Sequence, residues 1–240
     1  MSLSPGALVS VIVRTMSRPE LARALDRVAA QTYRPLEIVL VDAAATREAL
    51  HEHRDVPIVF VQRGALDRPR AANAGLAAAR GEAMMLNDED DEMEPTHVAD
   101  LVAALGTNRL ARVAYSQSRL VDEAGNTARV FGGPFDRMAL FRSNYLSSNA
   151  GLWERSLVAE GCRFDESFPI FEDWDFWLQC AMRTAFAFTG KPTAIYHGIE
   201  GRSGAGAGAN RDRERLLAQR ERLMRKWERA IRSLELAHGS

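Results

Sequence analysis

The chain has 240 residues, 46% of them hydrophobic, which is enough for one globular domain with a substantial core. Its 31 basic and 32 acidic residues leave a formal net charge of -1, and this balance excludes a chain-wide field that would attract nucleic acid. Two cysteines exclude a disulfide framework, and no apolar run approaches the roughly 20 residues of a membrane-spanning helix. The first residues lack a signal-peptide pattern, so we expect a soluble, cytoplasmic protein.

Strand and helix patterns alternate through the first part of the chain. Short apolar runs predict strands buried on both faces of a parallel sheet, at residues 8–13, 35–42, 57–61 and 83–86, and the first three runs contain β-branched residues. An alanine-rich helix is expected over residues 70–80. The short connections favour right-handed crossovers in one doubly wound sheet, and its first half is expected to bind a nucleotide.

Two further helices are predicted between these strands. Ser17, Pro19 and Glu20 form an N-cap, a first-turn proline and a capping-box acid for a helix that runs to about Gln31. A weak helix is expected through Glu48 and Leu50. Asp42 ends the second strand, at the sheet edge where ligands of open α/β sheets collect.

Six polar residues, 87–92, follow the strand at residues 83–86, and five of them are acidic. Carboxylates this dense repel one another at the mouth of a buried strand, so a cation is expected there. Residues i and i+2 of an extended segment point the same way, so Asp88 and Asp90 can converge on one divalent ion while Glu89 faces elsewhere. The alternative is a solvated acidic loop before a helix that begins at Pro95.

The second half is less regular. We expect a helix over residues 95–105 and strands at residues 111–118, 127–131 and 149–153, with a turn within 121–126 and a short helix near Leu157. No low-complexity linker separates the halves. We therefore predict one domain over residues 1–209, in which residues 8–92 bind the nucleotide and residues 93–209 shape an acceptor cleft with a lid.

A second acidic group opens a helix at residues 171–178. Trp174, Trp177 and Leu178 recur at helical spacing and form its buried stripe. Glu172, Asp173 and Asp175 lie in the first turn, where the backbone dipole stabilises carboxylates whether or not they do chemistry. The same dipole holds a carboxylate ionised and oriented, as a general base for a hydroxyl proton requires. Both interpretations stay open at this point.

The end of the chain carries a glycine-rich stretch and a basic helix. His197 ends a late strand and is either an ordinary hydrogen-bonded histidine or a metal or phosphate contact. Residues 198–208 form either a lid or a plain linker. Residues 210–240 predict an amphipathic basic helix, which packs on its own domain or contacts anionic lipid at the inner face of the membrane.

Taken together, the motifs resemble those of the inverting glycosyltransferases of family 2, which have the nucleotide-diphospho-sugar transferase (GT-A) fold. Residues 9–18 are similar to V-S-V-I-I-P-T-Y-N-R, and residues 31–45 to Q-T-Y-x-x-x-E-I-I-V-V-D-D-G-S. Residues 71–82 look like A-R-N-x-G-L-x-x-A-x-G-E, and residues 87–95 like L-D-x-D-D-x-x-x-P. Residues 164–166 and 172–177 match F-D-E and E-D-W-D-L-W. Their common order and spacing, rather than any single motif, carry the resemblance.

The resemblance implies a Rossmann-like, mostly parallel sheet with a smaller acceptor-side region and a C-terminal basic helix. It implies Mn²⁺ or Mg²⁺ at Asp90 and Asp88, with Asp173 as the base that deprotonates an acceptor hydroxyl. The resemblance implies roles for the remaining residues as well. It implies acceptor or base support for Glu172, Asp175 and Trp174, and nucleotide binding for Arg14, Thr15, Met16, Asp42, Arg70 and Asp88. It implies a metal or diphosphate contact for His197, and diphosphate contacts under the lid for Arg202 and Ser203.

The expected substrates are a nucleoside-diphosphate sugar, UDP-linked in most of the family, and a glycan or lipid-linked acceptor. Four positions that bear on the nucleotide depart from the motifs: Ala43 replaces the second Asp of V-D-D, Met16 the Tyr, Arg14 the Pro, and Ala72 the Arg of A-R-N. Arg68 and Arg70 are nearby substitutes for that last arginine. Either the base pocket suits another nucleotide, or binding relies more on metal and phosphate. The departures also leave two alternatives, a catalytically silent nucleotide- or glycan-binding module and a nucleotidyltransferase.

Overall fold

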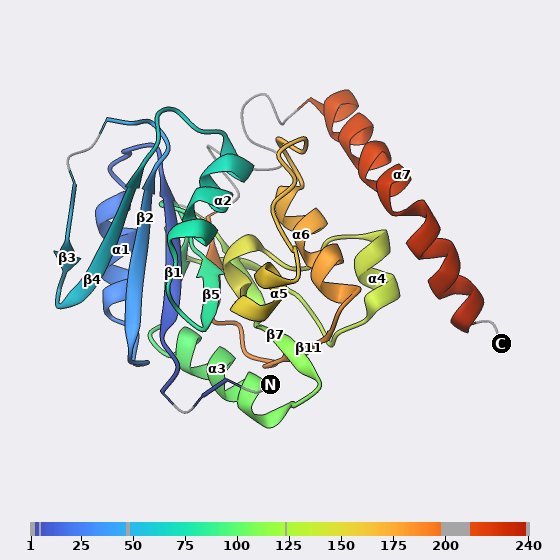
Figure 1. Ribbon diagram of the computed structural model, residues 1–240, viewed down its shortest axis with the longest axis horizontal. Helices are drawn as coiled ribbons and strands as arrows, with labels where there is room; N and C mark the ends of the chain where they lie inside the picture. Colours follow the sequence, from blue (N-terminus) through green and yellow to red (C-terminus); the bar gives the residue numbers. More distant parts are fainter. Residues whose placement is uncertain (1–2, 5, 47–48, 123, 198–211, 239–240) are drawn as a thin grey trace.

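A sheet of eight strands forms the centre of the molecule (Figure 1). The structure is a computed structural model that describes residues 3–4, 6–46, 49–122, 124–197 and 212–238. The strand order is β11-β7-β10-β5-β1-β2-β4-β3. The strands are β1 (Val9–Thr15), β2 (Leu36–Asp42), β3 (Glu52–His53), β4 (Val56–Gln62), β5 (Ala83–Leu86), β7 (Ala111–Tyr115), β10 (Gly151–Glu154) and β11 (Ala185–Phe188).

The sheet is mostly parallel, as the sequence predicts. β1 pairs in parallel with both β2 and β5, and β2 pairs in parallel with β4, whereas β10 runs antiparallel to β5 and β7. Every residue of β1 and β2 is buried, which explains their continuous apolar runs. The carboxyl ends of β1, β2 and β5 therefore meet at one edge, where the polar residues that follow each strand are brought together.

One glycine in the motif region is required by close packing. An added Cβ at Gly81, just before β5, would lie 2.7 Å from the carbonyl oxygen of Leu8 and the amide nitrogen of Ser10. Backbone atoms cannot yield to such a contact, so a side chain at this position would separate β5 from β1.

Helices cover the sheet and extend the molecule to one side. They are α1 (Leu21–Ala29), α2 (Arg68–Ala78), α3 (His97–Thr107), α4 (Arg137–Arg142), α5 (Arg155–Ala159), α6 (Glu172–Ala181), α7 (Arg213–His238) and the 3₁₀ turn η1 (Ser148–Ala150). α7 runs beside α4, at the opposite end of the molecule from β3 and β4 (Figure 1). Leu223 of α7 is fully buried, so this helix packs on its own domain.

A second, smaller sheet has the order β6-β12-β8-β9. Its strands are β6 (Glu92–Met93), β8 (Ser118–Val121), β9 (Thr127–Phe131) and β12 (Ala194–Tyr196). The single strand predicted over residues 111–118 is wrong, because the chain leaves β7 after Tyr115 and enters this sheet at Ser118. The crossing residues bond to different partners: the Ser116 amide donates to the carbonyl of Ala150, and the Gln117 amide to that of Lys191.

The helix predicted to run to about Gln31 is present as α1, but its start is wrong. Ser17 is not an N-cap, because its backbone is left-handed (φ 63°) and α1 begins only at Leu21, after Glu20. The weak helix through Leu50 is wrong, because Ala49 and Leu50 lead directly into β3; Glu48 lies outside the described residues. The hairpin of β3 and β4 turns through Arg54 and Asp55, which both have positive φ. Because neither residue is a glycine, the sequence does not indicate this turn. α4 and β11 were not predicted.

The proposed division at residue 209 stays a prediction, and the predicted lid at residues 198–208 falls outside the described residues. Among the described helices, none combines the length and apolar character needed to cross a bilayer.

Candidate active site

The acidic residues after β5 form one compact group. The Asn87 amide bonds to the carbonyl of Ile12 and the Glu89 amide to that of Arg14, so the segment continues alongside β1 for three residues. The chain then turns, because the Asp91 amide donates to the carbonyl of Asp88 at 3.0 Å. Carboxylate oxygens of Asp88, Asp90 and Asp91 consequently lie within 4.8 Å of one another. The sequence predicts the convergence of Asp88 and Asp90 but misses Asp91, which the turn brings in.

Glu89 points to the opposite side, toward the loop after β1. Its carboxylate accepts hydrogen bonds from the Thr15 hydroxyl at 2.5 Å, the Met16 amide at 3.0 Å and the Arg18 amide at 3.1 Å. Glu89 is buried. It therefore fixes the loop that carries Thr15 and Met16, two of the residues that the resemblance assigns to the nucleotide.

Two arginines join the acids after β5 to those at the start of α6. Arg14 donates to both carboxylate oxygens of Asp88, at 2.6 and 2.7 Å, and lies 3.3 Å from Glu172. Arg68 donates to Glu172 at 2.7 Å and to Asp88 at 3.2 Å. Burial alone would raise the pKa of Asp88, but Arg14 and Arg68 outweigh it and lower that pKa to about 2. Asp88 and Glu172 are therefore ionised and held in fixed positions.

Asp173 lies beside this network and has a different environment. Burial and the neighbouring negative charge of Glu172 raise the pKa of Asp173 to about 6. The Trp174 amide donates to one of its oxygens at 2.7 Å, and the Asn144 side-chain amide lies 3.5 Å from the other. Arg68 and Arg14 have the opposite effect on Glu172, whose pKa they lower against the effect of burial. A carboxylate with a pKa near 6 is suited to accept a proton at neutral pH.

Both acidic groups open onto a single cavity of about 750 Å³. Asp88, Asp90 and Asp91 line it from the end of β5, and Glu172, Asp173 and Trp174 line it from the start of α6. The indole of Trp174 is anchored below the cavity, because its Nε1 donates to the carbonyl of Leu140 at 2.8 Å.

Other lining residues could not be recognised from the sequence. Tyr196 of β12 faces the acids; burial first, and then the charge of Asp91, raise its pKa to about 12, so its hydroxyl stays protonated as a donor. Asn144 comes from the loop after α4. Neither residue stands in a motif, because each is brought to the cavity only by the folding of the second sheet and α4.

A smaller hollow of about 330 Å³ adjoins the acids on the side of β1 and α2. Arg14, Thr15, Met16, Ala43 and Asp88 are among its lining residues. This places most of the predicted nucleotide contacts around one space. The motif departures Arg14, Met16 and Ala43 all lie there too, so they change the shape and charge of this hollow.

Asp42 and Arg70, which the resemblance also assigns to the nucleotide, line neither cavity. Asp42 is fully buried and accepts from the Gln62 side chain at 3.0 Å and the Ala44 amide at 3.2 Å. Arg70 points to the surface, where it pairs with Asp67 and lies 3.2 Å from Glu166. Arg68, two residues earlier, takes the interior position.

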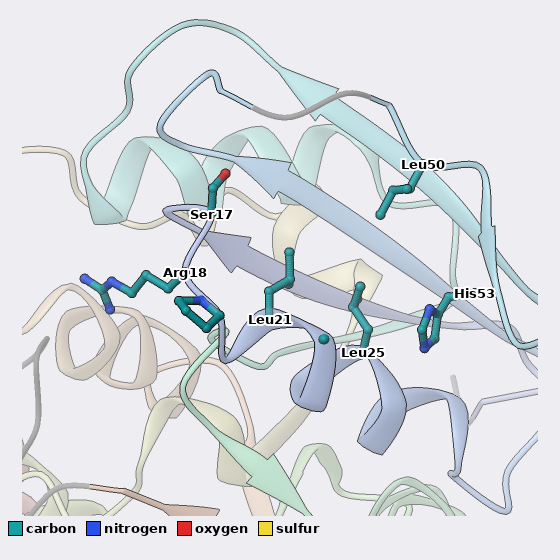
Figure 2. Close-up of a pocket in the computed structure, with 8 residues that line it drawn as sticks. Ser17, Arg18, Leu21, Leu25, Leu50 and His53 are labelled. Atoms are coloured by element: carbon teal, nitrogen blue, oxygen red, sulfur yellow. The ribbon is translucent and has the colours of Figure 1, made fainter.

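A third hollow, of about 450 Å³, lies against α1 and contains none of the acidic groups (Figure 2). Leu21, Leu25 and Leu50 give it apolar walls, and His53 closes one end. The guanidinium of Arg18 points away from these leucines (Figure 2) and lies 3.5 Å from Glu89 and 3.6 Å from Asp90. Arg18 therefore contributes its charge to the acidic group rather than to this hollow.

Four further predicted site residues lie elsewhere or are not described. Asp175 is fully buried on the side of α6 that faces α7, where it accepts from Lys226 at 2.8 Å and from the Trp227 indole at 2.9 Å. His197 lies 2.9 Å from Glu92, whose pKa is lowered to about 2 by that hydrogen bond and by Arg27. Arg202 and Ser203 fall outside the described residues.

The three aspartates fit a divalent cation. They offer only carboxylate oxygens, the donors that Mg²⁺ and Mn²⁺ prefer. Burial and the charges of Asp90 and Asp88 raise the pKa of Asp91 well above its usual value, despite Arg68 and Arg14, which shows that the cationic side chains do not fully compensate the group. A bound cation would supply the missing positive charge. Asp88 is the weakest candidate ligand, because Arg14 already occupies both of its oxygens.

Residues 10–148 match the sequence model of Glycosyl transferase family 2, which is more than half of the chain. Among curated proteins, the chain is 27% identical over 187 residues to the uncharacterized glycosyltransferase YwdF of Bacillus subtilis, covering 72% of this chain and 68% of YwdF. It is 28% identical over 218 residues to the succinoglycan biosynthesis protein ExoO of Rhizobium meliloti, covering 80% of this chain and 60% of ExoO.

Solved structures share the fold. S. aureus TarS (residues 1–349) superposes with a TM-score of 0.66 at 18% identity, over 79% of this chain and 60% of TarS. The mannosyltransferase PcManGT of Pyrobaculum calidifontis, in complex with GDP-Man and Mn²⁺, superposes with a TM-score of 0.58 at 18% identity, over 82% of this chain and 59% of that chain. The chain thus spans about three fifths of the length of these solved structures.

Proposed function

The chain belongs to glycosyl transferase family 2 and is a transferase with the GT-A fold; from this premise we propose that it moves a sugar from a nucleoside-diphosphate sugar to an acceptor hydroxyl, with inversion at the anomeric carbon. One observation carries the proposal. The aspartates that fit a cation and the carboxylate with a pKa near 6 line the same cavity. In a transfer of this kind, a cation at the departing diphosphate and a base at the attacking hydroxyl act on opposite sides of one reacting carbon.

On the donor side, Asp90 and Asp91, with Asp88 as a weaker third ligand, would hold Mn²⁺ or Mg²⁺ against the diphosphate. A bound cation would neutralise the charge that develops on the departing nucleoside diphosphate. Arg14 and Arg68 keep Asp88 and Glu172 ionised and in place, so these side chains would not need to reorganise as that charge develops. The hollow lined by Thr15, Met16 and Ala43 would take the nucleoside.

TarS has been solved with UDP-GlcNAc and PcManGT with GDP-Man and Mn²⁺, which supports a nucleotide sugar as the donor and a divalent cation as the cofactor. A uridine donor is our first choice, as in most of the family, but Ala43 and Met16 remove two side chains that the motif supplies to the base. A purine base therefore belongs in any donor screen.

On the acceptor side, Asp173 would accept the proton of the attacking hydroxyl. The oxygen then bonds to the anomeric carbon from the face opposite the diphosphate, the bond to the diphosphate oxygen breaks, and the configuration inverts. Asn144 and the Trp174 amide orient the Asp173 carboxylate, and Glu172 raises its pKa. Asp175 is not assigned to this step, because its carboxylate contacts α7.

We retain a glycan or lipid-linked molecule as the acceptor, and diphosphate contacts from His197, Arg202 and Ser203 when the donor is bound. The arginine-rich exposed face of α7 would allow peripheral contact with anionic lipid.

A panel of UDP-, GDP-, dTDP- and ADP-sugars tests the function. The melting temperature of the protein is measured with each compound and Mn²⁺, and again with EDTA, since a ligand that binds the native state raises it by mass action. We expect one nucleotide to stabilise the protein with Mn²⁺ and to lose most of the effect in EDTA. Absence of binding by every nucleoside diphosphate would favour the silent-module alternative.

A further inference from the structure

Two arginines line the active-site cavity without an ion pair to its acids among the described residues. Arg129 lies in β9 and Arg220 in α7, and both side chains are exposed at the cavity. Among the described residues, neither one is paired with a carboxylate; Arg220 donates instead to the carbonyl of Arg142 at 3.0 Å. The third arginine of the lining differs, because Arg68 is committed to Glu172 and Asp88.

The position of β9 separates Arg129 from the cation-binding aspartates. β6, which follows the acidic segment, and β9 are the two edges of the small sheet, with β12 and β8 between them. Three strand spacings place these edges about 14 Å apart. Arg129 pairs with Leu120 across the sheet, and Phe131 lies two residues further on β9; all three line the cavity, so this face of β9 is turned toward it. Arg129 therefore lies on the acceptor side rather than at the diphosphate.

Arg220 is connected to the proposed base through the loop after α4, and both residues line the same cavity. The carbonyl that it bonds belongs to Arg142, two residues before Asn144, and Asn144 contacts Asp173. A group bound by Arg220 would consequently belong to the molecule whose hydroxyl faces Asp173. Glu172, Asp173 and the three aspartates would repel a negatively charged acceptor. The positive charges of Arg129 and Arg220 would offset this repulsion.

Helix α7 holds Arg220 in this position. Leu223 is fully buried, the Trp227 indole donates to Asp175 at 2.9 Å, and Arg222 donates to the carbonyl of Ser167 at 2.8 Å. The match to the family model ends at residue 148, well before α7. Arg220 is thus a feature of this chain beyond the matched part, which is where acceptor specificity is expected to differ between relatives.

We propose that Arg129 and Arg220 form an anion-binding subsite, and that the acceptor is a glycan bearing a carboxylate or phosphate at a distance from the reacting hydroxyl. The inference rests on the proposed function, because it takes Asp173 as the point that the acceptor hydroxyl must reach. Guanidinium groups bind both kinds of oxyanion through paired hydrogen bonds.

A glycan array separates the two sources of negative charge. The wild-type protein, loaded with Mn²⁺ and the nucleoside diphosphate that binds it best, is applied to neutral, uronate-bearing and phosphate-bearing oligosaccharides. We compare it with Arg129→Gln, Arg220→Gln, the double variant, and Arg229→Gln, an exposed arginine of α7 outside the cavity lining. The anionic class that binds identifies the group.

We expect anionic glycans to bind at least tenfold more tightly than their neutral counterparts. Each cavity variant should lower that affinity about tenfold, as expected for loss of one charge-assisted contact, and Arg229→Gln should leave it unchanged. The inference is overturned if neutral and anionic glycans bind alike, if no anionic glycan binds, or if the double variant binds as the wild type does.

The two proposals fail in different ways. Glycan binding on the array is measured without sugar transfer, and the affinity for the nucleoside diphosphate is measured on the same samples. Binding of anionic glycans without sugar transfer to them would contradict the proposed function and the role of these glycans as acceptors, and would support only the anion-binding site. Efficient transfer to neutral acceptors, unaffected by Arg129→Gln and Arg220→Gln, would support the function and overturn the subsite.

Discussion

Arg14 and Asp88 form a buried pair in which the guanidinium donates to both carboxylate oxygens, at 2.6 and 2.7 Å. Arg14 stands where the family motif has proline, so the chain supplies its own cation to the first aspartate of the acidic segment. In the proposed function, Asp90 and Asp91 would therefore be the main ligands for a bound cation. The same arginine lies 3.3 Å from Glu172, and thereby connects the end of β5 to the start of α6.

Replacing Arg14 by Met should destabilise the fold. Asp88 and Glu172 would stay buried and keep Arg68 as their ion-pair partner, and loss of one partner from a buried ion pair costs about 3 to 5 kcal/mol. Urea unfolding measures the change in the free energy of unfolding. Arg232→Met is the matched control, since its pair with Glu228 is exposed and should contribute less than about 0.5 kcal/mol. Equal stability of the two variants would show that Arg14 is dispensable.

Lys226→Met tests the attachment of α7. The fully buried Asp175 would keep its hydrogen bonds from Trp227 and Gln179 but lose its charged partner, at a cost of about 2 kcal/mol. The double variant Asp175→Asn, Lys226→Met should recover part of this loss, because it removes the uncompensated charge. Arg225→Met, which breaks an exposed pair with Glu221, serves as control. A double variant less stable than Lys226→Met would contradict this account.

The rate of transfer should depend on the protonation of Asp173. A base works only when deprotonated, and the pKa of Asp173 is raised to about 6 by burial and by Glu172. kcat is therefore expected to rise about tenfold per pH unit below pH 6 and to level off above it. A profile that stays flat between pH 5 and 8, with donor saturating, would mean that Asp173 is not the base.

The same carboxyl group should lower stability at neutral pH. Its native pKa lies above the usual value of 3.8, so the native state holds this proton more tightly than the unfolded state, and the stabilising contribution is lost as pH rises from about 4 through 6. Asp173→Asn should therefore melt at a higher temperature than the wild type at pH 8 and at nearly the same temperature at pH 4. A variant that melts lower at pH 8 would assign Asp173 a structural part.

The sequence predicts what lies along a single strand or helix turn. The strands β1, β2 and β5, the convergence of Asp88 and Asp90, and the carboxylates at the start of α6 all follow from local patterns. The α/β class, the mostly parallel sheet and the family are confirmed.

The rest depends on contacts between segments far apart in the chain. The motifs correctly place Asp42 at the carboxyl end of β2 and Asp175 in the first turn of α6. However, Gln62 donates a hydrogen bond to Asp42, and Lys226 forms an ion pair with Asp175. The residues next to Asp42 and Asp175 in the sequence do not indicate these partners. In the sequence, Arg14 is only a departure from a motif. Its ion pairs with Asp88 and Glu172 become visible only in the structure. Arg220 reaches the cavity only because α7 folds back onto α4 and α6.

In the proposed function, one cavity would hold a cation beside Asp90 and a base at Asp173. To test this, Asp90→Asn and Asp173→Asn are compared in the same two assays: nucleoside diphosphate affinity with Mn²⁺ by calorimetry, and sugar transfer under donor saturation. Asp90→Asn should lose Mn²⁺-dependent nucleotide binding. Asp173→Asn should keep that affinity within about twofold and lose a factor of about 10² to 10⁴ in kcat. Loss of nucleotide binding in Asp173→Asn, or Mn²⁺-independent transfer that survives in Asp90→Asn, would contradict the account.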